Sequence, residues 1–330
     1  MSKPERIREE IDDLFPHHSW IARQKVAVLL PCYNEEVAIG AVVRDFRAAL
    51  PEARIYVYDN NSTDGTLDEA ERAGAIVRCE PYQGKGHVVR RMLADIDADI
   101  YVIADGDGTY DAGAATMLIE TLVKENLDMI VGARAGGGEE AYRRGHRAGN
   151  RFFNRMVASL FGPGFTDILS GYRVLSRRFA KSFPVTSGGF EIETELSVHA
   201  LDLKIATREV PVPYGKRPEG SASKLRTYHD GFRILMTILT LMKELQPLRF
   251  FGAIAAALAV VAIGLGLPLL HTYIETGLVP RLPTAVLAAA IMQLAFLSLA
   301  CGLILDSLAR ARREAKRMRY LDLQSVAHRD

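Results

Sequence analysis

Two carboxylates that lie one residue apart, Asp105 and Asp107, come directly after a short apolar run of the chain. Paired oxygen ligands of this kind suit Mg²⁺ or Mn²⁺, and these ions keep open positions for the oxygens of a bound phosphate. A diphosphate held on such an ion is further neutralised by Lys and Arg side chains. The pair therefore predicts a metal-assisted site with basic groups around it.

Three parts of the sequence offer those basic groups. Lys85 lies between two glycines, and Arg134 follows the β-rich run Met129–Gly132. A glycine- and serine-flanked stretch, 216–224, holds the remaining candidates, which are Lys216, Arg217, Ser223 and Lys224. Single Lys or Arg residues are usually solvated surface groups, so the composition of 216–224 makes it the strongest of the three.

Polar clusters also follow two other apolar runs, at Pro31–Glu36 and Asp59–Thr66. Each cluster on its own is explained by helix capping and tight turns, because Ser, Thr, Asp and Asn are favoured there. Three of them on successive strand ends favour a shared crevice, since ligands of open α/β sheets bind beyond the carboxyl ends of the strands.

Short β-rich runs alternate with helical stretches from Lys25 to about Val210, which predicts an α/β fold with a mostly parallel sheet and helices on both faces. The expected strands are Val26–Leu30, Arg54–Tyr58, Ala75–Arg78, Ile100–Ala104, Met129–Gly132 and Lys204–Val210. The expected helices are Glu36–Leu50, Thr66–Ala73, Gly86–Ala94, Ala112–Glu125 and Arg143–Leu160.

The last third of the chain differs in character. Phe250–Leu270 and Thr284–Leu305 contain no charged residue, and each is long enough as a helix to cross roughly 30 Å of hydrocarbon. The basic residues cluster before the first segment and after Leu305, while the connecting segment has one Arg and one Glu. By the positive-inside rule, the large domain and the C-terminus lie in the cytoplasm of a multi-pass inner-membrane protein.

Apolar residues before the first span recur at steps of three and four, at Leu225, Tyr228, Phe232, Leu235, Leu239 and Met242. This stripe predicts a helix that either packs on the core or lies in the headgroup plane. The expected organisation is an extension (1–24), a catalytic domain (25–224), this amphipathic helix (225–247), a two-helix membrane region (248–306) and a basic tail (307–330).

Composition excludes several classes of protein. The chain has 330 residues, 41 Lys+Arg against 40 Asp+Glu, and a formal net charge of +1, which argues against a protein that coats nucleic acid. The three cysteines are widely spaced and form neither a disulfide framework nor a zinc ribbon. No glycine-rich dinucleotide fingerprint or P-loop is present.

The motifs resemble those of the inverting family 2 glycosyltransferases with the GT-A fold, and the matching segments are Pro31–Glu35, Asp59–Thr66 and Asp105–Asp107. Three further segments resemble the polyprenyl-phosphate branch of that family, the dolichyl- and undecaprenyl-phosphate sugar synthases: Asp167–Arg173, Gly189–Glu193 and Glu209–Pro213. The resemblance covers about residues 25–245, and two spans after the domain match bacterial members.

The resemblance implies a role for each matching residue. Pro31, Tyr33, Glu35, Asp59, Asn60, Lys85, Asp105 and Arg217 would bind the nucleotide-sugar, and Asp105 and Asp107 would hold Mg²⁺ or Mn²⁺. Asp107, Arg134 and Lys224 would carry catalysis, and the acceptor phosphate would meet Arg134, Lys216, Arg217, Ser223 and Lys224. Asn60 stands where the family usually has a second acid, and Thr109 stands where many relatives have Gln near the metal. Arg217 lies one residue farther from Lys224 than expected, so Lys216 is an alternative to it.

The resemblance implies a membrane-anchored, metal-dependent hexosyltransferase that transfers a sugar with inversion from a nucleotide-sugar to a polyprenyl phosphate. UDP-sugars are the preferred donors and GDP-sugars the alternative, and the lipid-linked product would serve cell-envelope glycan or lipopolysaccharide modification. A nonprocessive transferase with a saccharide or protein acceptor is the alternative function. Related membrane-anchored members form homo-oligomers such as tetramers, and bulk membrane lipid is a further expected partner.

Overall fold

The structure is a computed structural model that describes residues 24–135, 144–220 and 227–326. The chain divides into two compact units. One unit is built from the chain up to Leu235 together with the segment from Lys316 onward, and the other is Met236–Ala315.

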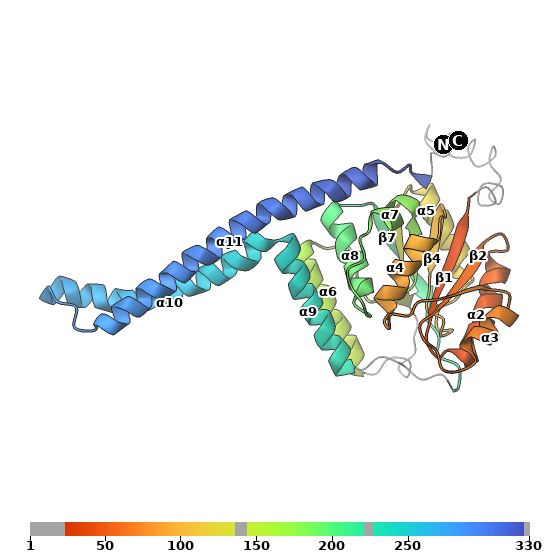
Figure 1. Cartoon of the computed structure of the whole chain (residues 1–330), viewed down its shortest axis with the longest axis horizontal. Coiled ribbons are helices and arrows are strands. Elements are labelled where there is room, and N and C mark those ends of the chain that lie inside the picture. Colours follow the sequence, from red (N-terminus) through yellow and green to blue (C-terminus); the bar gives the residue numbers. More distant parts are fainter. Residues whose placement is uncertain (1–23, 136–143, 221–226, 327–330) are drawn as a thin grey trace, which may run out of the picture. The chain divides into compact units, whose positions relative to one another are not determined.

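The first unit contains a seven-stranded sheet with the strand order β3-β2-β1-β4-β6-β5-β7 (Figure 1). The strands are β1 (Val26–Cys32), β2 (Arg54–Asp59), β3 (Ile76–Cys79), β4 (Ile100–Ile103), β5 (Met129–Ala135), β6 (Arg173–Ser176) and β7 (Thr207–Pro213). All neighbouring pairs are parallel except the two that involve β6, which runs antiparallel to both β4 and β5. The expected mostly parallel sheet is therefore confirmed.

Helices connect successive strands of the sheet, and a further helix follows the last strand. In chain order they are α2 (Glu36–Ala49), α3 (Thr66–Arg72), α4 (Lys85–Asp95), α5 (Ala114–Lys124), α6 (Arg144–Phe161), α7 (Arg177–Ser182), α8 (Ile192–Leu203) and α9 (Thr227–Leu245). Helix α2 contacts α3 and α5, whereas α4 contacts α7 and α8, so the helices form two separate groups.

Burial on both faces explains the continuous apolar runs of the central strands. Val28 and Leu30 of β1 belong to the core cluster that also contains Ile39 of α2 and Leu118 of α5. Leu29, which points to the opposite face of β1, is equally inaccessible to solvent. Strands covered on both faces lose the polar–apolar alternation of a half-exposed sheet, as this sequence does.

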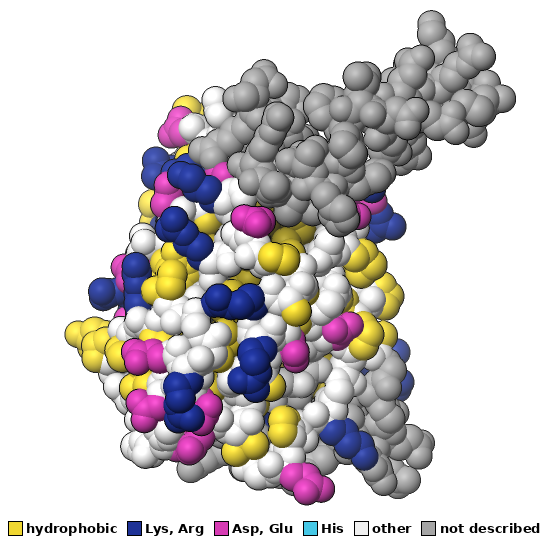
Figure 2. Space-filling model, turned by 90° about the vertical axis from the view of Figure 1, so that its right-hand side faces the viewer, with side chains coloured by type: hydrophobic (Ala, Val, Ile, Leu, Met, Phe, Trp, Pro, Cys, Tyr) yellow, Lys and Arg dark blue, Asp and Glu magenta, His cyan; other side chains and the backbone are white. Residues whose placement is uncertain are grey.

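The surface of the first unit is mixed in charge. Figure 2 looks onto the side that lies at the right of Figure 1, and Lys and Arg side chains there are interspersed with Asp and Glu. Apolar side chains on this face are scattered singly or in small groups. Such a surface is typical of a domain in contact with water.

The second unit contains α10 (Pro247–Thr276) and most of α11 (Leu282–Leu321). Both helices are long and apolar enough to cross a membrane, and most of their apolar side chains are exposed. The buried positions of α11 recur at every seventh residue and are all small, namely Ala288, Ala295, Gly302 and Ala309. Small residues let two helix backbones approach closely, and a Cβ on Gly302 would lie 3.1 Å from the Cβ of Phe251 in α10.

Helix α9 forms where the apolar stripe predicts a helix, but its most buried residues are offset from that stripe. Ile234, Ile238 and Leu241 are buried, whereas Phe232 is 62% exposed. The reason is that apolar residues cover more of the circumference of α9 than the predicted stripe does. Periodicity alone therefore did not identify which side of the helix is buried. Leu225 of the stripe lies outside the described residues.

The end of α11 and the residues after it pack on the first unit. The hydroxyl of Tyr320 donates to Oδ2 of Asp128 at 2.6 Å, and the guanidinium of Arg178 lies 4.8 Å from the centre of the Tyr320 ring. Asp128 is buried, and Val326 joins the core cluster. The segment after Lys316 is thus part of the first unit's fold.

Candidate active site

The site is assembled at the carboxyl ends of three neighbouring parallel strands, β2, β1 and β4. Loops after β1 and β2 are tied together, because the amide of Asn34 donates to Ser62 at 2.8 Å and the amide of Glu35 donates to Thr66 at 2.8 Å. Asn34 adopts a left-handed backbone with φ of 52°, a conformation that Asn tolerates. The predicted convergence of the polar clusters on one edge of the sheet is therefore observed.

The two carboxylate oxygens of Asp59, the last residue of β2, differ in their hydrogen bonding. Oδ2 accepts from the amide of Ser62 at 3.0 Å, but Oδ1 is buried and has no hydrogen-bond partner among the described residues. A buried acceptor without a partner costs free energy unless a ligand supplies a donor. Oδ1 of Asp59 can therefore accept a hydrogen bond from a ligand, and the prediction that Asp59 contacts a nucleotide base stays a prediction.

Asn60, the neighbour of Asp59, is fully engaged with the protein. Its amide nitrogen donates to the carbonyls of Glu80 and Tyr82, both at 2.9 Å. Its side-chain oxygen accepts from the amide of Gly84 at 2.7 Å. These contacts hold the loop that leads into α4, and the prediction that Asn60 binds the nucleotide stays a prediction.

The two predicted metal carboxylates are each paired with a cation. Nζ of Lys85 forms an ion pair with Oδ1 of Asp105, and Nη2 of Arg217 lies 2.6 Å from Oδ2 of Asp107. Thr109 donates through its hydroxyl to Oδ1 of Asp107 at 2.6 Å. Burial and the neighbouring charge of Asp105 raise the pKa of Asp107.

Lys85 has a second carboxylate partner that the sequence did not identify. Its Nζ lies 2.5 Å from Oε1 of Glu193, which is buried in the first turn of α8. Burial alone would lower the pKa of Lys85, but the charges of Asp105 and Glu193 raise it above its ordinary value. Lys85 is therefore a fully paired cation at the centre of the site.

The donor set fits a divalent metal ion that also binds substrate oxygens. Asp105 and Asp107 offer hard oxygen ligands, and within the described ranges no three His, Cys, Asp or Glu side chains form a closed cage. The backbone of Gly171 comes so close that a Cβ there would lie 2.7 Å from Oδ2 of Asp105. A two-carboxylate site leaves coordination positions for a diphosphate, as the sequence predicts.

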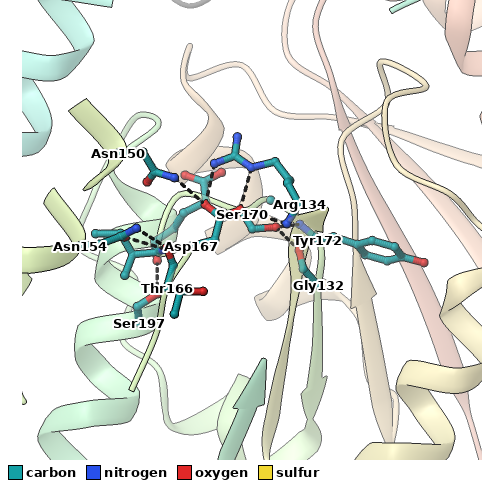
Figure 3. A network of polar contacts seen from close by, with 12 residues as sticks. Gly132, Arg134, Asn150, Asn154, Thr166, Asp167, Ser170, Tyr172 and Ser197 are labelled. Atoms are coloured by element: carbon teal, nitrogen blue, oxygen red, sulfur yellow. Dashed lines mark hydrogen bonds and ion pairs between the residues drawn. The ribbon is translucent and has the colours of Figure 1, made fainter. Parts of the chain in front are cut away.

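Arg134, at the end of β5, is held by a chain of polar contacts (Figure 3). Its Nε and Nη2 donate to the two oxygens of Asp167 at 2.8 and 2.6 Å, and its backbone amide donates at 3.1 Å. Glu209 in turn accepts from the amides of Asp167 and Thr166 at 2.8 and 2.7 Å. Burial would raise the pKa of Asp167, but the hydrogen bonds and charge of Arg134 keep it below its ordinary value.

Arg173 is completely buried and supports the same region. Its guanidinium donates to the carbonyls of Ile168, Ser170 and Glu193 at 2.9, 3.1 and 2.9 Å. Burial lowers the pKa of Arg173 to about 10. The side chain thus joins the loop after Asp167 to the first turn of α8, where Glu193 lies.

The remaining predicted residues fall into two groups. Pro31 lies within β1, next to its last residue, and the exposed Tyr33 follows that strand. Oε1 of Glu35 lies 3.4 Å from Nη1 of Arg217. Lys216 precedes Arg217 on the described part of its loop. Ser223 and Lys224 lie outside the described residues, so their predicted contact with an acceptor phosphate stays a prediction.

Comparison with known proteins places this geometry in a family. The model of the family described as "Glycosyl transferase family 2" matches residues 27–183. Glycosyltransferase AglJ of Haloferax volcanii is 40% identical over 250 residues, which are 75% of this chain and 81% of that protein. The dolichyl-phosphate hexose transferase of the same organism is 29% identical over 66% of this chain and 94% of its own length.

Solved structures share the fold. Glucosyl-3-phosphoglycerate synthase of Mycobacterium tuberculosis, in complex with Mn²⁺, uridine diphosphate and phosphoglyceric acid, gives a TM-score of 0.55 at 24% identity. The match covers 69% of this chain and 80% of that one. Together with the relative from Haloferax, the matching family model leads to one conclusion. The chain belongs to glycosyl transferase family 2.

Proposed function

We propose that the protein transfers a sugar, with inversion, from a nucleoside diphosphate sugar to the phosphate of a polyprenyl phosphate. The observation that carries the proposal is the pairing of Asp105 and Asp107 with the cations of Lys85 and Arg217 at the carboxyl end of the sheet. Acidic ligands for a metal and basic groups for phosphates are both needed when a diphosphate leaves.

The donor nucleotide would lie on the loops after β1 and β2. The unpartnered Oδ1 of Asp59 suits the N–H of a base, and the exposed ring of Tyr33 offers a surface for stacking. Uracil presents one N–H between two carbonyls, so a UDP-sugar is the donor that we favour. Pro31 and Glu35 complete this side of the proposed pocket.

Mg²⁺ or Mn²⁺ on Asp105 and Asp107 would supply positive charge to the leaving diphosphate. The protein's own part is to orient that diphosphate and to neutralise it with Lys85 and Arg217. Thr109, through its hydroxyl, keeps the carboxylate of Asp107 in place.

The acceptor phosphate would meet Arg134 together with the basic 216–224 stretch. A phosphate monoester is already an oxyanion at neutral pH, so the attack on the anomeric carbon needs no general base, in contrast to the attack by a sugar hydroxyl. Direct displacement then inverts the linkage, which gives a β-linked product from an α-linked donor. The relative named as a dolichyl-phosphate hexose transferase supports this class of acceptor.

The same proposal makes α10 and α11 membrane spans. The segment from Lys316 belongs to the catalytic unit, as the contact between Tyr320 and Asp128 illustrates. Both ends of the α10–α11 hairpin would then lie on the side of the membrane that holds this unit, as two crossings require. The basic residues after Leu305 favour the cytoplasm as that side.

The test is transfer of radiolabel from UDP-sugars and GDP-sugars to short polyprenyl phosphates by purified protein. We expect label in the butanol phase only when Mg²⁺ or Mn²⁺ is present. Label that stays in water with a saccharide acceptor would favour the nonprocessive alternative. Undiminished turnover of Asp107→Asn in a metal chelator would refute the proposed mechanism.

A further inference from the structure

Six charged side chains, the two metal carboxylates among them, form two neighbouring ion-pair groups that are largely buried. Lys85 bridges Asp105 and Glu193, and Arg217 bridges Asp107 and Glu35. Together the two groups have four carboxylates and two cations, so their formal charge is −2 when every group is ionised. Uncompensated charge in a mostly buried site is unfavourable, and one divalent cation would balance it.

We propose that Lys85 and Arg217 are built-in counter-ions of the metal carboxylates, and that Glu193 is a positioning residue that retains Lys85 when a metal takes Asp105. The inference rests on the proposed function, because it assumes a metal and a diphosphate at this site. It adds a residue, Glu193, and an order of events: the metal competes with Lys85 for Asp105, and Glu193 keeps the ammonium group beside the phosphates.

The surroundings of Glu193 fit a fixed anchor. Its carbonyl accepts from Arg173 at 2.9 Å and from the hydroxyl of Ser197 at 2.9 Å, and its side chain is only 7% exposed. The anchor cannot easily follow Lys85 if that side chain moves. Lys85 therefore has two fixed carboxylates within reach, and only one of them is a predicted metal ligand.

The backbone of Lys85 is fixed as well. Gly84 adopts a φ of 134°, and the amide of Gly86 donates to the carbonyl of Gly188 at 3.1 Å. A Cβ at Gly84 would lie 2.2 Å from that carbonyl oxygen, so the start of α4 is pressed against the 186–188 loop. The freedom of Lys85 is thus confined to its side chain, which can shift between Asp105 and Glu193.

The proposal predicts opposite effects of two substitutions on metal binding in the absence of nucleotide. Lys85→Met removes the competitor for Asp105, so the affinity for Mn²⁺ should rise about tenfold, within the range by which outer-shell partners change metal affinity. Glu193→Gln leaves Asp105 as the only carboxylate of Lys85, so the affinity should fall about tenfold. A purely structural role would move both affinities in the same direction.

Both substitutions should lower the affinity for the nucleotide. With saturating Mn²⁺, Lys85→Met should weaken UDP binding by about tenfold or more, because a charge-assisted hydrogen bond to phosphate is lost. Glu193→Gln should weaken it less, since the ammonium group remains but is less well held. For Lys85→Met, a higher affinity for Mn²⁺ together with a lower affinity for UDP is the result expected of a cation that moves from a carboxylate to a phosphate.

The experiment uses the full chain in detergent at one fixed pH. Mn²⁺ binding is followed by the electron paramagnetic resonance signal of the free ion, and UDP binding by calorimetry. Glu195→Gln is the matched control: Glu195 lies two residues from Glu193 on α8, is equally buried, and accepts from Thr186 and Ser187. Its Mn²⁺ affinity should equal that of the unchanged protein.

Opposite changes for Lys85→Met and Glu193→Gln support the proposal, and changes of the same sign, or none, overturn it. If Lys85→Met does not fold, Lys85→Gln is measured in the same way. Neither assay contains an acceptor, so a wrong acceptor class would leave these results intact. Failure of the unchanged protein to bind both Mn²⁺ and UDP would overturn the donor half of the proposed function and this inference with it.

Discussion

The ion pair between Arg134 and Asp167 gives a prediction that can be worked from the structure. The Asp167 side chain is 9% exposed and that of Arg134 15%, and two hydrogen bonds of 2.6 and 2.8 Å join them. Asp167→Asn replaces one acceptor with an NH₂ group that faces the donors of the guanidinium. Breaking a buried pair by changing one partner costs about 3 kcal/mol or more.

That loss corresponds to a fall in Tm of about 6–12 °C, since 1 kcal/mol shifts Tm by about 2–4 °C for a domain of this size. The assay is thermal unfolding of the full chain in detergent, with turnover measured in parallel. The Arg134 side chain should also become less well placed, so KM for the acceptor should rise more than kcat falls.

A matched control is the pair of Arg177 and Asp97. Nη2 of Arg177 lies 2.7 Å from Oδ1 of Asp97, but the Asp97 side chain is 63% exposed. Exposed pairs contribute about 1 kcal/mol at most, so Asp97→Asn should lower Tm by no more than about 4 °C. If Asp167→Asn lowers Tm by no more than Asp97→Asn does, burial is not what makes the Arg134 pair strong, and the reasoning is wrong.

Three further substitutions test the surrounding fold. Arg173→Met removes the guanidinium donor from three carbonyls, of which, in the described part of the chain, only that of Glu193 keeps a second side-chain donor, and should destabilise the protein by about 3 kcal/mol or more, measured as Tm. Burial lowers the pKa of His199 to about 3, below the unfolded 6.5, so unfolding takes up a proton in acid. Stability should fall by about 2 kcal/mol from pH 7 to pH 5, and a smaller fall in His199→Phe would show that His199 is responsible. Tyr320→Phe loses the bond to Asp128, about 1–2 kcal/mol, and trypsin should cleave the tail several-fold faster; an unchanged rate would mean that the contact does not hold it.

The sequence predicted the centre of the sheet because β1, β2 and β4 are apolar runs, each followed by a polar cluster. Strand β6 was missed because its four residues include Arg173. A charged residue normally indicates a surface position, but this side chain is buried. Helix α8 was missed because it is buried on nearly all sides and carries Glu193 and His199 inward, so no amphipathic period marks it.

The site was predictable to the extent that it uses local motifs. Asp105 and Asp107 could be paired from their spacing alone, whereas the partners of Lys85 and Arg134 lie far along the chain. Both partners, Glu193 and Asp167, fall within segments that resemble the polyprenyl-phosphate branch. The resemblance thus marked the segments, but only the fold identified which side chain touches which.

The departure at Asn60 has a structural explanation. The loop from Glu80 to Gly84 presents two carbonyls and one amide to the end of β2, and Asn60 meets them with two N–H donors and one acceptor. An aspartate would place a carboxylate against two carbonyl oxygens in a buried site, where unmatched acceptors are costly. Asn60 is therefore explained by its support of the loop that leads to Lys85, which leaves the unpartnered oxygen of Asp59 as the proposed contact to the base.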